Sequence, residues 1–164
     1  MTSATVALKS TKREVWREAL DRSAREVFAA ILGIHLEVAS QEPASFEFTA
    51  TVGFAGDLRG VISLSCNRST AMSMTESMLK SDYTASEDQI WDALGEICNV
   101  LAGRFKNGPP RLANNCILSV PTVITGSNYQ QHPLGGAGTL QKSFLLKDQM
   151  IRIAVAIHEQ PPSK

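Results

Sequence analysis

The chain has 164 residues, of which 43% are hydrophobic and 20% charged. This length suits one well-buried core, so we predict a single domain over residues 1–164. Basic and acidic residues number 16 each, so no basic excess favours a nucleic-acid partner. No apolar run approaches the about 20 residues of a membrane span, and residues 1–9 have no signal-peptide core. We therefore expect no membrane association.

The first half of the chain contains one helix and three strands. Thr11 and Glu14 have capping-box spacing and precede apolar residues at three- and four-residue steps, which predicts a long helix ending at Gly33. Apolar and polar residues then alternate over 34–38, 46–54 and 58–66, which predicts three strands. Pro43 lies in the first turn, and residues 55–57 form a short hairpin loop. Residues 1–10 and 159–164 are expected to be flexible tails.

Two further helices follow. Ser69 is the expected N-cap of a short helix whose methionines at helical spacing favour flexible core packing over a binding groove. Thr84 and Glu87 form a second capping-box pattern, and this helix runs through Phe105 until the Gly-Pro-Pro sequence at 108–110 ends it.

The last part of the chain predicts three strands near 116–126, 139–146 and 150–158. Pro121 indicates a bulge or a sheet edge in the first strand. A tight turn at 147–149 joins the last pair. The glycine-rich segment 127–138 is a strand connection, since it lacks the Lys-Ser/Thr pair and the helix of a phosphate-binding loop. The element order predicts an α+β domain with a mainly antiparallel sheet of five to six strands.

Cysteines and histidines give little sign of chemistry. Cys66, Cys98 and Cys116 are far apart, lack C-x-x-C spacing and leave one thiol unpaired in any scheme. They are expected to be small core residues in a reducing compartment, which the bacterial cytoplasm fits best. The three histidines form no pair at metal-ligand spacing, so no metal site is expected.

The third predicted helix has two distinct faces. At about 100° per residue its apolar residues share one face. The opposite stripe consists of Asp92, Gly95, Glu96, Asn99, Gly103 and Lys106. Each interior glycine costs a helix roughly 1 kcal/mol relative to alanine, so two on one face indicate close approach by another backbone. That backbone belongs either to a partner or to this same domain, in which case Glu96 and Asn99 merely solvate the surface.

The segment 94–103, LGEICNVLAG, resembles the signature of the CheC, CheX and FliY phosphatases, in which a Glu-x-x-Asn pair precedes two apolar residues, a small residue and glycine. The segment 118–126, with an internal proline and a final glycine, resembles the strand that follows this helix in the family. The single motif is similar to the CheX type and implies a CheC-like fold and a homodimer formed through the sheet. Arg104 and Phe105 depart from the smaller residues of the family pattern.

The resemblance implies hydrolysis of an aspartyl phosphate on a CheY-like receiver that supplies Mg²⁺, while this chain needs no cofactor of its own. Asn99 would hold the attacking water. Glu96 would pair with the receiver's active-site lysine. Gly95 and Gly103, with Asp92 and Lys106 at the two ends of the stripe, are candidate receiver contacts. Two alternatives stay open: a receiver-binding or flagellar adaptor module without catalysis, and a purely structural dimer unit.

Overall fold

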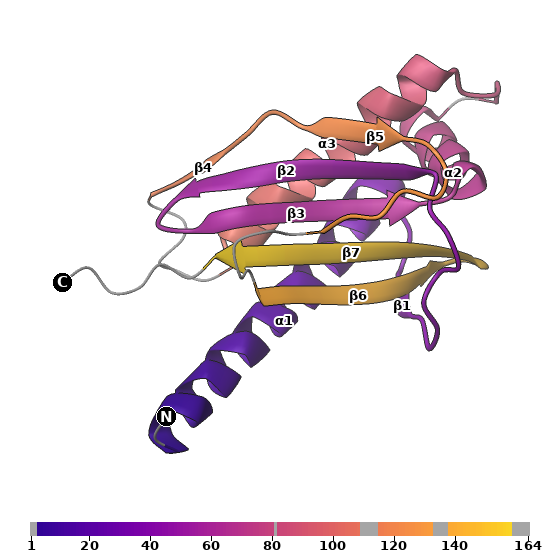
Figure 1. Ribbon diagram of the computed structural model, residues 1–164. Helices are drawn as coiled ribbons and strands as arrows, with labels where there is room; N and C mark the ends of the chain where they lie inside the picture. The colour runs from indigo at the N-terminus through magenta and orange to yellow at the C-terminus, as the bar shows by residue number, and fades with distance from the viewer. Residues whose placement is uncertain (1–2, 81, 109–114, 133–137, 159–164) are drawn as a thin grey trace.

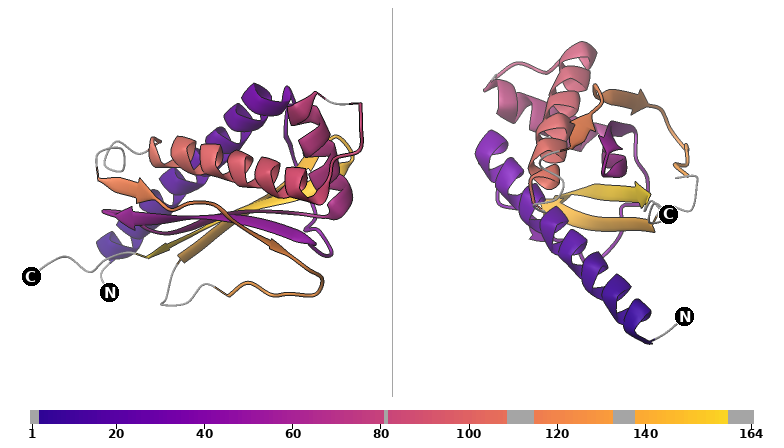
Figure 2. Two further views of the ribbon diagram at one scale, coloured as in Figure 1. Left: turned by 90° about the horizontal axis from the view of Figure 1, so that it is seen from above. Right: turned by 90° about the vertical axis from the view of Figure 1, so that its left-hand side faces the viewer.

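A seven-stranded antiparallel sheet carries three helices on one face in the described part of the chain (Figures 1 and 2). The computed structural model describes residues 3–80, 82–108, 115–132 and 138–158. The α+β class and the antiparallel sheet are therefore confirmed. In chain order the elements are α1 (Ser3–Leu32), β1 (Glu37–Val38), β2 (Phe48–Gly56), β3 (Arg59–Cys66), α2 (Arg68–Leu79), α3 (Glu87–Lys106), β4 (Cys116–Leu118), β5 (Thr122–Thr125), β6 (Gly138–Leu146) and β7 (Gln149–His158).

The strands are ordered β1-β6-β7-β3-β2-β4, and β5 also pairs with β2. The hairpins β2–β3 and β6–β7 confirm the predicted turns, and Lys147 in the second turn has φ 61°. Strand β1 is only two residues long, shorter than the predicted strand 34–38, and the carbonyl of Leu36 just before it accepts a hydrogen bond from Arg25 of α1. Strand β1 pairs with β6, whereas β2 lies between β3 and β4, so the connection that contains Pro43 joins two strands that are not neighbours.

The predicted strand 116–126 is divided into β4 and β5, which both pair with β2. The register shifts by one residue between the pairs Phe54–Leu118 and Thr51–Thr122, which defines a β-bulge at residues 119–121. The hydroxyl of Ser119 accepts a hydrogen bond from Gly53 N at 2.8 Å and holds the bulge on the sheet. The prediction that Pro121 marks a bulge or a sheet edge is confirmed, and the structure shows both.

All three predicted helix starts were wrong. Helix α1 begins at Ser3, so residues 3–10 are helical. The flexibility expected of the N-terminal residues stays a prediction, and the expected C-terminal tail, 159–164, lies outside the described residues. Helix α2 is capped by Asn67, whose side chain accepts from Thr70 N at 2.8 Å. Helix α3 is capped by Ser86 in a capping box with Gln89. Several Ser, Thr and Asn residues lie near each boundary, so composition alone did not select the cap.

The core lies between the sheet and the helices. Helix α3 crosses the sheet over β2 and β3 and also packs against α1 and α2 (Figure 2). Phe105 contacts the rings of Trp16 and Phe54 at centroid distances of 5.6 and 5.9 Å. Met74 of α2 is fully buried, which confirms that the methionines serve the core. This packing fixes α3 along its whole length.

Candidate functional site on helix α3

Helix α3 presents one face to the core and the other to solvent, as the sequence predicted. The core face is at most 2% exposed at Ile90, Leu94, Ile97, Cys98, Leu101 and Phe105. Acidic residues lie in the first turn and basic residues in the last, which matches the helix dipole. The helix is thus a rigid support for the side chains on its outer stripe.

Glu96 and Asn99 lie on that outer stripe, three residues apart. Glu96 is exposed and Asn99 is half-buried. Neither side chain has a hydrogen-bond or ion-pair partner among the described residues of this chain. Residues at this spacing are neighbours on a helix surface. A carboxylate and a carboxamide are therefore held side by side and free to bind a group from outside the domain.

Gly95 brings strand β5 close to the helix. A Cβ atom at Gly95 would lie 3.4 Å from Pro121 Cβ and 3.9 Å from Val123 Cγ2. The backbone that Gly95 allows to approach the helix therefore belongs to the same domain. This was one of the two alternatives stated for the stripe glycines, the other being the backbone of a partner. Any direct contact of the buried Gly95 with a partner stays a prediction.

Gly103 lies in different surroundings. A Cβ atom there would have no heavy atom within 4 Å, apart from the helix's own backbone. No packing within the described domain requires a glycine at this position, although each interior glycine costs helix stability. Because Gly103 has no side chain, it leaves a shallow depression on the outer face of α3, one turn beyond Asn99.

The two ends of the stripe differ in their contacts. Lys106 Nζ donates to the carbonyl of Cys116 at 2.9 Å and ties the end of α3 to β4. Asp92 is exposed, and its side chain has no hydrogen-bond or ion-pair partner among the described residues. A contact of either residue with a receiver stays a prediction.

The two residues that depart from the family pattern have structural roles. Phe105 is a fully buried core residue. Arg104 forms an ion pair with Glu26 of α1. Both side chains point away from the stripe of Glu96 and Asn99, since they fasten α3 to the sheet and to α1. The departures therefore leave the pair itself unchanged.

Two exposed apolar residues flank the stripe and were not singled out from the sequence. Trp91 is 40% exposed, and its indole donates to Thr125 Oγ1 of β5 at 3.0 Å. Val120 is 82% exposed in the bulge, directly before Pro121. Contiguous exposed apolar patches mark contact surfaces, whereas single exposed apolar residues are common, so a partner contact of Trp91 or Val120 is a proposal. Alternation within a predicted strand could not reveal Val120, because the bulge interrupts the alternation.

The described residues contain no group of three or more His, Cys, Asp or Glu side chains that could hold a metal ion. No helix in the described part of the chain is long and apolar enough to cross a membrane. All three cysteines are buried and free, and burial raises the pKa of Cys66 and of Cys98 to about 12. Their thiols are therefore core groups, as predicted.

Comparison with known proteins gives a family match over most of the folded region. The model of the family described as chemotaxis phosphatase CheX matches residues 48–143, which include all of α3 and the bulge. No curated protein sequence is similar enough to count as a match.

Solved structures share the fold at low sequence identity. A CheX from Desulfovibrio desulfuricans is 18% identical with a TM-score of 0.74, and the match covers 87% of this chain and 99% of that one. A CheX from Vibrio vulnificus is 18% identical with a TM-score of 0.75, over 87% and 96%. A CheX–CheY–BeF₃–Mg²⁺ complex from Borrelia burgdorferi is 22% identical with a TM-score of 0.73, over 87% and 97%. At these identities the structures show the fold alone.

Proposed function

This chain belongs to the CheX family of chemotaxis phosphatases, and on that premise we propose that it hydrolyses the aspartyl phosphate of a CheY-like receiver. The observation that carries the proposal is the pair Glu96 and Asn99, adjacent on a rigid helix and without side-chain partners in the described chain. The solved CheX–CheY complex from Borrelia burgdorferi, which has a similar fold, supports a receiver as the partner. A side-chain pair on a convex helix fits another protein's active site better than it encloses a small substrate.

Asn99 is the catalytic residue in this proposal. Its carboxamide accepts a hydrogen bond from water and donates one to a phosphoryl oxygen, so it holds the water in line with the bond to be broken. Water attacks phosphorus, the P–O bond to the receiver's aspartate breaks, and its electron pair stays on the carboxylate. Inorganic phosphate leaves, and the proton of the water passes to phosphate or solvent. Asn99 therefore acts by positioning and takes no proton.

Glu96 orients the complex. Its exposed carboxylate would pair with the receiver's active-site lysine, one helical turn from Asn99. Mg²⁺ would be supplied by the receiver and would neutralise charge on the transferred phosphoryl group. The solved complex from Borrelia burgdorferi, which contains CheY, BeF₃ and Mg²⁺, supports this source of the metal.

The docking surface would extend beyond the pair. Gly103, on the stripe, would leave room for a receiver backbone beside α3. Val120, in the bulge beside the stripe, would offer an apolar contact. Asp92 and Lys106 would contact the receiver at the ends of the stripe. We also propose, from the family resemblance, that the protein works as a cytoplasmic homodimer joined through its sheet.

Phosphate release from a phosphorylated receiver tests this function. A receiver phosphorylated with a small-molecule donor should lose phosphate faster when the wild-type chain is added, and Asn99→Ala should remove the acceleration. A receiver that binds but whose phosphate lifetime is unchanged would favour the adaptor module. No binding at all would favour a structural dimer unit.

A further inference from the structure

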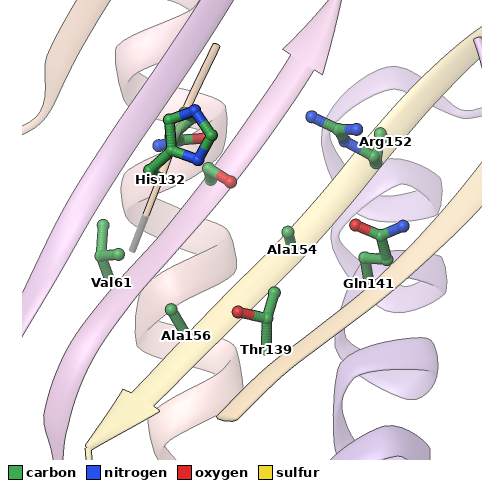
Figure 3. Close-up of a pocket in the computed structure, with 9 residues that line it drawn as sticks. Val61, His132, Thr139, Gln141, Arg152, Ala154 and Ala156 are labelled. Atoms are coloured by element: carbon green, nitrogen blue, oxygen red, sulfur yellow. The ribbon is translucent and has the colours of Figure 1, made fainter. Parts of the chain in front are cut away.

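The face of the sheet opposite the helices carries a cavity that the proposed phosphatase function does not use. It has a volume of about 320 Å³ and is lined by residues of β3, β6, β7 and the segment after β5 (Figure 3). A second cavity of about 540 Å³ shares Gln131, His132 and Arg152 with the first. Volumes in this range suit small-molecule ligands. The helix stripe with Glu96 and Asn99 lies on the other side of the sheet.

The floor of the cavity is a row of small side chains. The register places Val61 opposite Ala156 and Ser63 opposite Ala154, with Thr139 and Gln141 on the next strand. These short side chains leave a hollow across three strands. Figure 3 shows Ala154 lying between His132 and Gln141, with Arg152 beside them. The hollow therefore has an apolar floor and polar walls.

Arg152 is the unusual group in this cavity. Its Nε atom is buried and has no hydrogen-bond partner in the described residues. Its guanidinium lies over the ring of Phe46, with the Cζ atom 4.3 Å from the ring centroid, which fixes its orientation. Buried polar atoms in native proteins nearly always have partners. An unpaired Nε on an oriented guanidinium therefore indicates that an acceptor from outside the chain completes it.

The charges around Arg152 select the class of acceptor. Neither cavity has an aspartate or glutamate among its described lining residues. Glu42 accepts a hydrogen bond at 2.9 Å from Ser143, which lies opposite Arg152 in the register of β6 and β7, but no ion pair joins Glu42 to Arg152. The glutamines and His132 add further hydrogen-bonding groups. The cationic centre is therefore open to an anion.

We propose that this cavity binds a small organic anion whose carboxylate or phosphate group pairs with Arg152 and whose apolar part rests on Ala154 and Ala156. The Nε–H of an arginine and a neighbouring Nη–H form a pair of parallel donors that matches both groups. The small floor residues leave room for a flat apolar group.

Amide chemical shifts measured by NMR test the proposal, with benzoate, phenyl phosphate and inorganic phosphate as probes and sodium chloride as the ionic-strength control. Benzoate or phenyl phosphate should shift the signals of Arg152, Ala154 and Gln141 saturably, with a Kd below about 1 mM. The benzoate and phenyl phosphate arms distinguish the carboxylate from the phosphate. Inorganic phosphate should bind more weakly because it lacks the apolar part.

Two variants that should weaken binding and one matched control that should not complete the test. Arg152→Lys keeps the charge but removes the paired donors, so affinity should fall at least about tenfold. Ala154→Leu fills the hollow and should remove binding without changing charge. Arg104→Lys, on the opposite side of the sheet, should leave affinity unchanged. Thermal unfolding checks that each variant is folded.

Three results would overturn the proposal. One is an unsaturated response up to about 10 mM that matches sodium chloride. Another is saturable binding that persists in both Arg152→Lys and Ala154→Leu. The third is a set of shifts that follow protein concentration instead of probe concentration, which would show that a second copy covers this face. None of these results depends on phosphatase activity.

Discussion

Gly95 of helix α3 and Pro121 of the bulge meet so closely that a Cβ atom at Gly95 would lie 3.4 Å from Pro121 Cβ. This contact joins the stripe of Glu96 and Asn99 to the edge of the sheet. The indole of Trp91 reinforces it one turn earlier through its bond to Thr125. The helix and the edge strands therefore form a single continuous surface.

Asn99→Ala should abolish the acceleration of receiver dephosphorylation while binding is kept. The alanine removes the water-positioning amide from an outer-face residue, so the fold should be unaffected. The loss should be about 10²-fold or more in kcat, with a Kd for the phosphorylated receiver within about twofold of wild type. Single-turnover phosphate release and a binding titration measure the two quantities. Unchanged phosphate release would refute the role of Asn99.

Glu96→Ala should weaken both binding and turnover. The carboxylate is exposed in the free protein, and its proposed partner is the receiver's lysine. Its loss should therefore destabilise the complex both before the reaction and in the transition state. We expect Kd to rise about tenfold and kcat/KM to fall by at least as much. Glu37→Ala, at an exposed glutamate on the opposite edge strand β1, is the matched control and should change neither. Equal effects of the two substitutions would show that position is unimportant.

Val120→Asp should raise KM for the phosphorylated receiver about tenfold and leave kcat nearly unchanged. The side chain is 82% exposed beside Pro121, so the substitution affects contact with a partner far more than it affects the core. Ile117→Asp is the control. Ile117 is 73% exposed on the same sheet edge, but it pairs with Ala55 near the far end of β2. A similar rise in KM for both variants would place the docking surface elsewhere.

The sequence predicted the face that carries Glu96 and Asn99, because helical periodicity depends only on residues three and four positions apart. Six apolar positions recur with the correct spacing, so the opposite stripe with Glu96 and Asn99 followed directly. The glycine-rich segment 127–138 was expected to be a connection. Its described residues 127–132 lie between β5 and β6, whereas Gly138 is the first residue of β6. The surroundings of Gly95 and Gly103 differ, and spacing could not distinguish a glycine packed on Pro121 from one that faces open space.

Features that depend on contacts distant in sequence were predictable only in part. Pro121 indicated a bulge or a sheet edge, but only the fold determines the register of this bulge with β2, and the shortness of β1 was not predicted. The cavity on the outer face is made by residues from three strands whose neighbours only the fold determines. Capping residues were displaced by two or more positions, because several residues near each helix start can serve as caps.

Gly103→Ala separates the needs of the fold from those of the proposed partner. Because a Cβ atom would meet nothing within 4 Å, alanine should raise the free energy of unfolding by about 0.5–1 kcal/mol. If a receiver backbone approaches this position, kcat/KM should fall in the same variant. Urea unfolding and phosphate release measure the two effects. Lower stability would contradict the open surroundings of Gly103, and unchanged activity would contradict its role in docking.

Asp21→Asn should reduce stability near neutral pH and have little effect in acid. Burial raises the pKa of Asp21, but hydrogen bonds from Lys142 and Arg25 outweigh this and hold it below its usual value. Because the folded-state pKa is lowered, this stabilisation is fully present above the unfolded pKa of about 3.9. It is lost as the pH falls through the lower folded-state value.

Urea unfolding of the wild type and of Asp21→Asn at several pH values measures this contribution. The two ion pairs are partly exposed, so the difference at pH 7 should be about 1 kcal/mol, and it should shrink steadily below about pH 4. Asp82→Asn, at an exposed position, is the control and should change stability little at any pH. A difference between the wild type and Asp21→Asn that stays constant from neutral to acidic pH would mean that the loss comes from packing, and that the carboxylate of Asp21 does not tie α1 to β6 through charge.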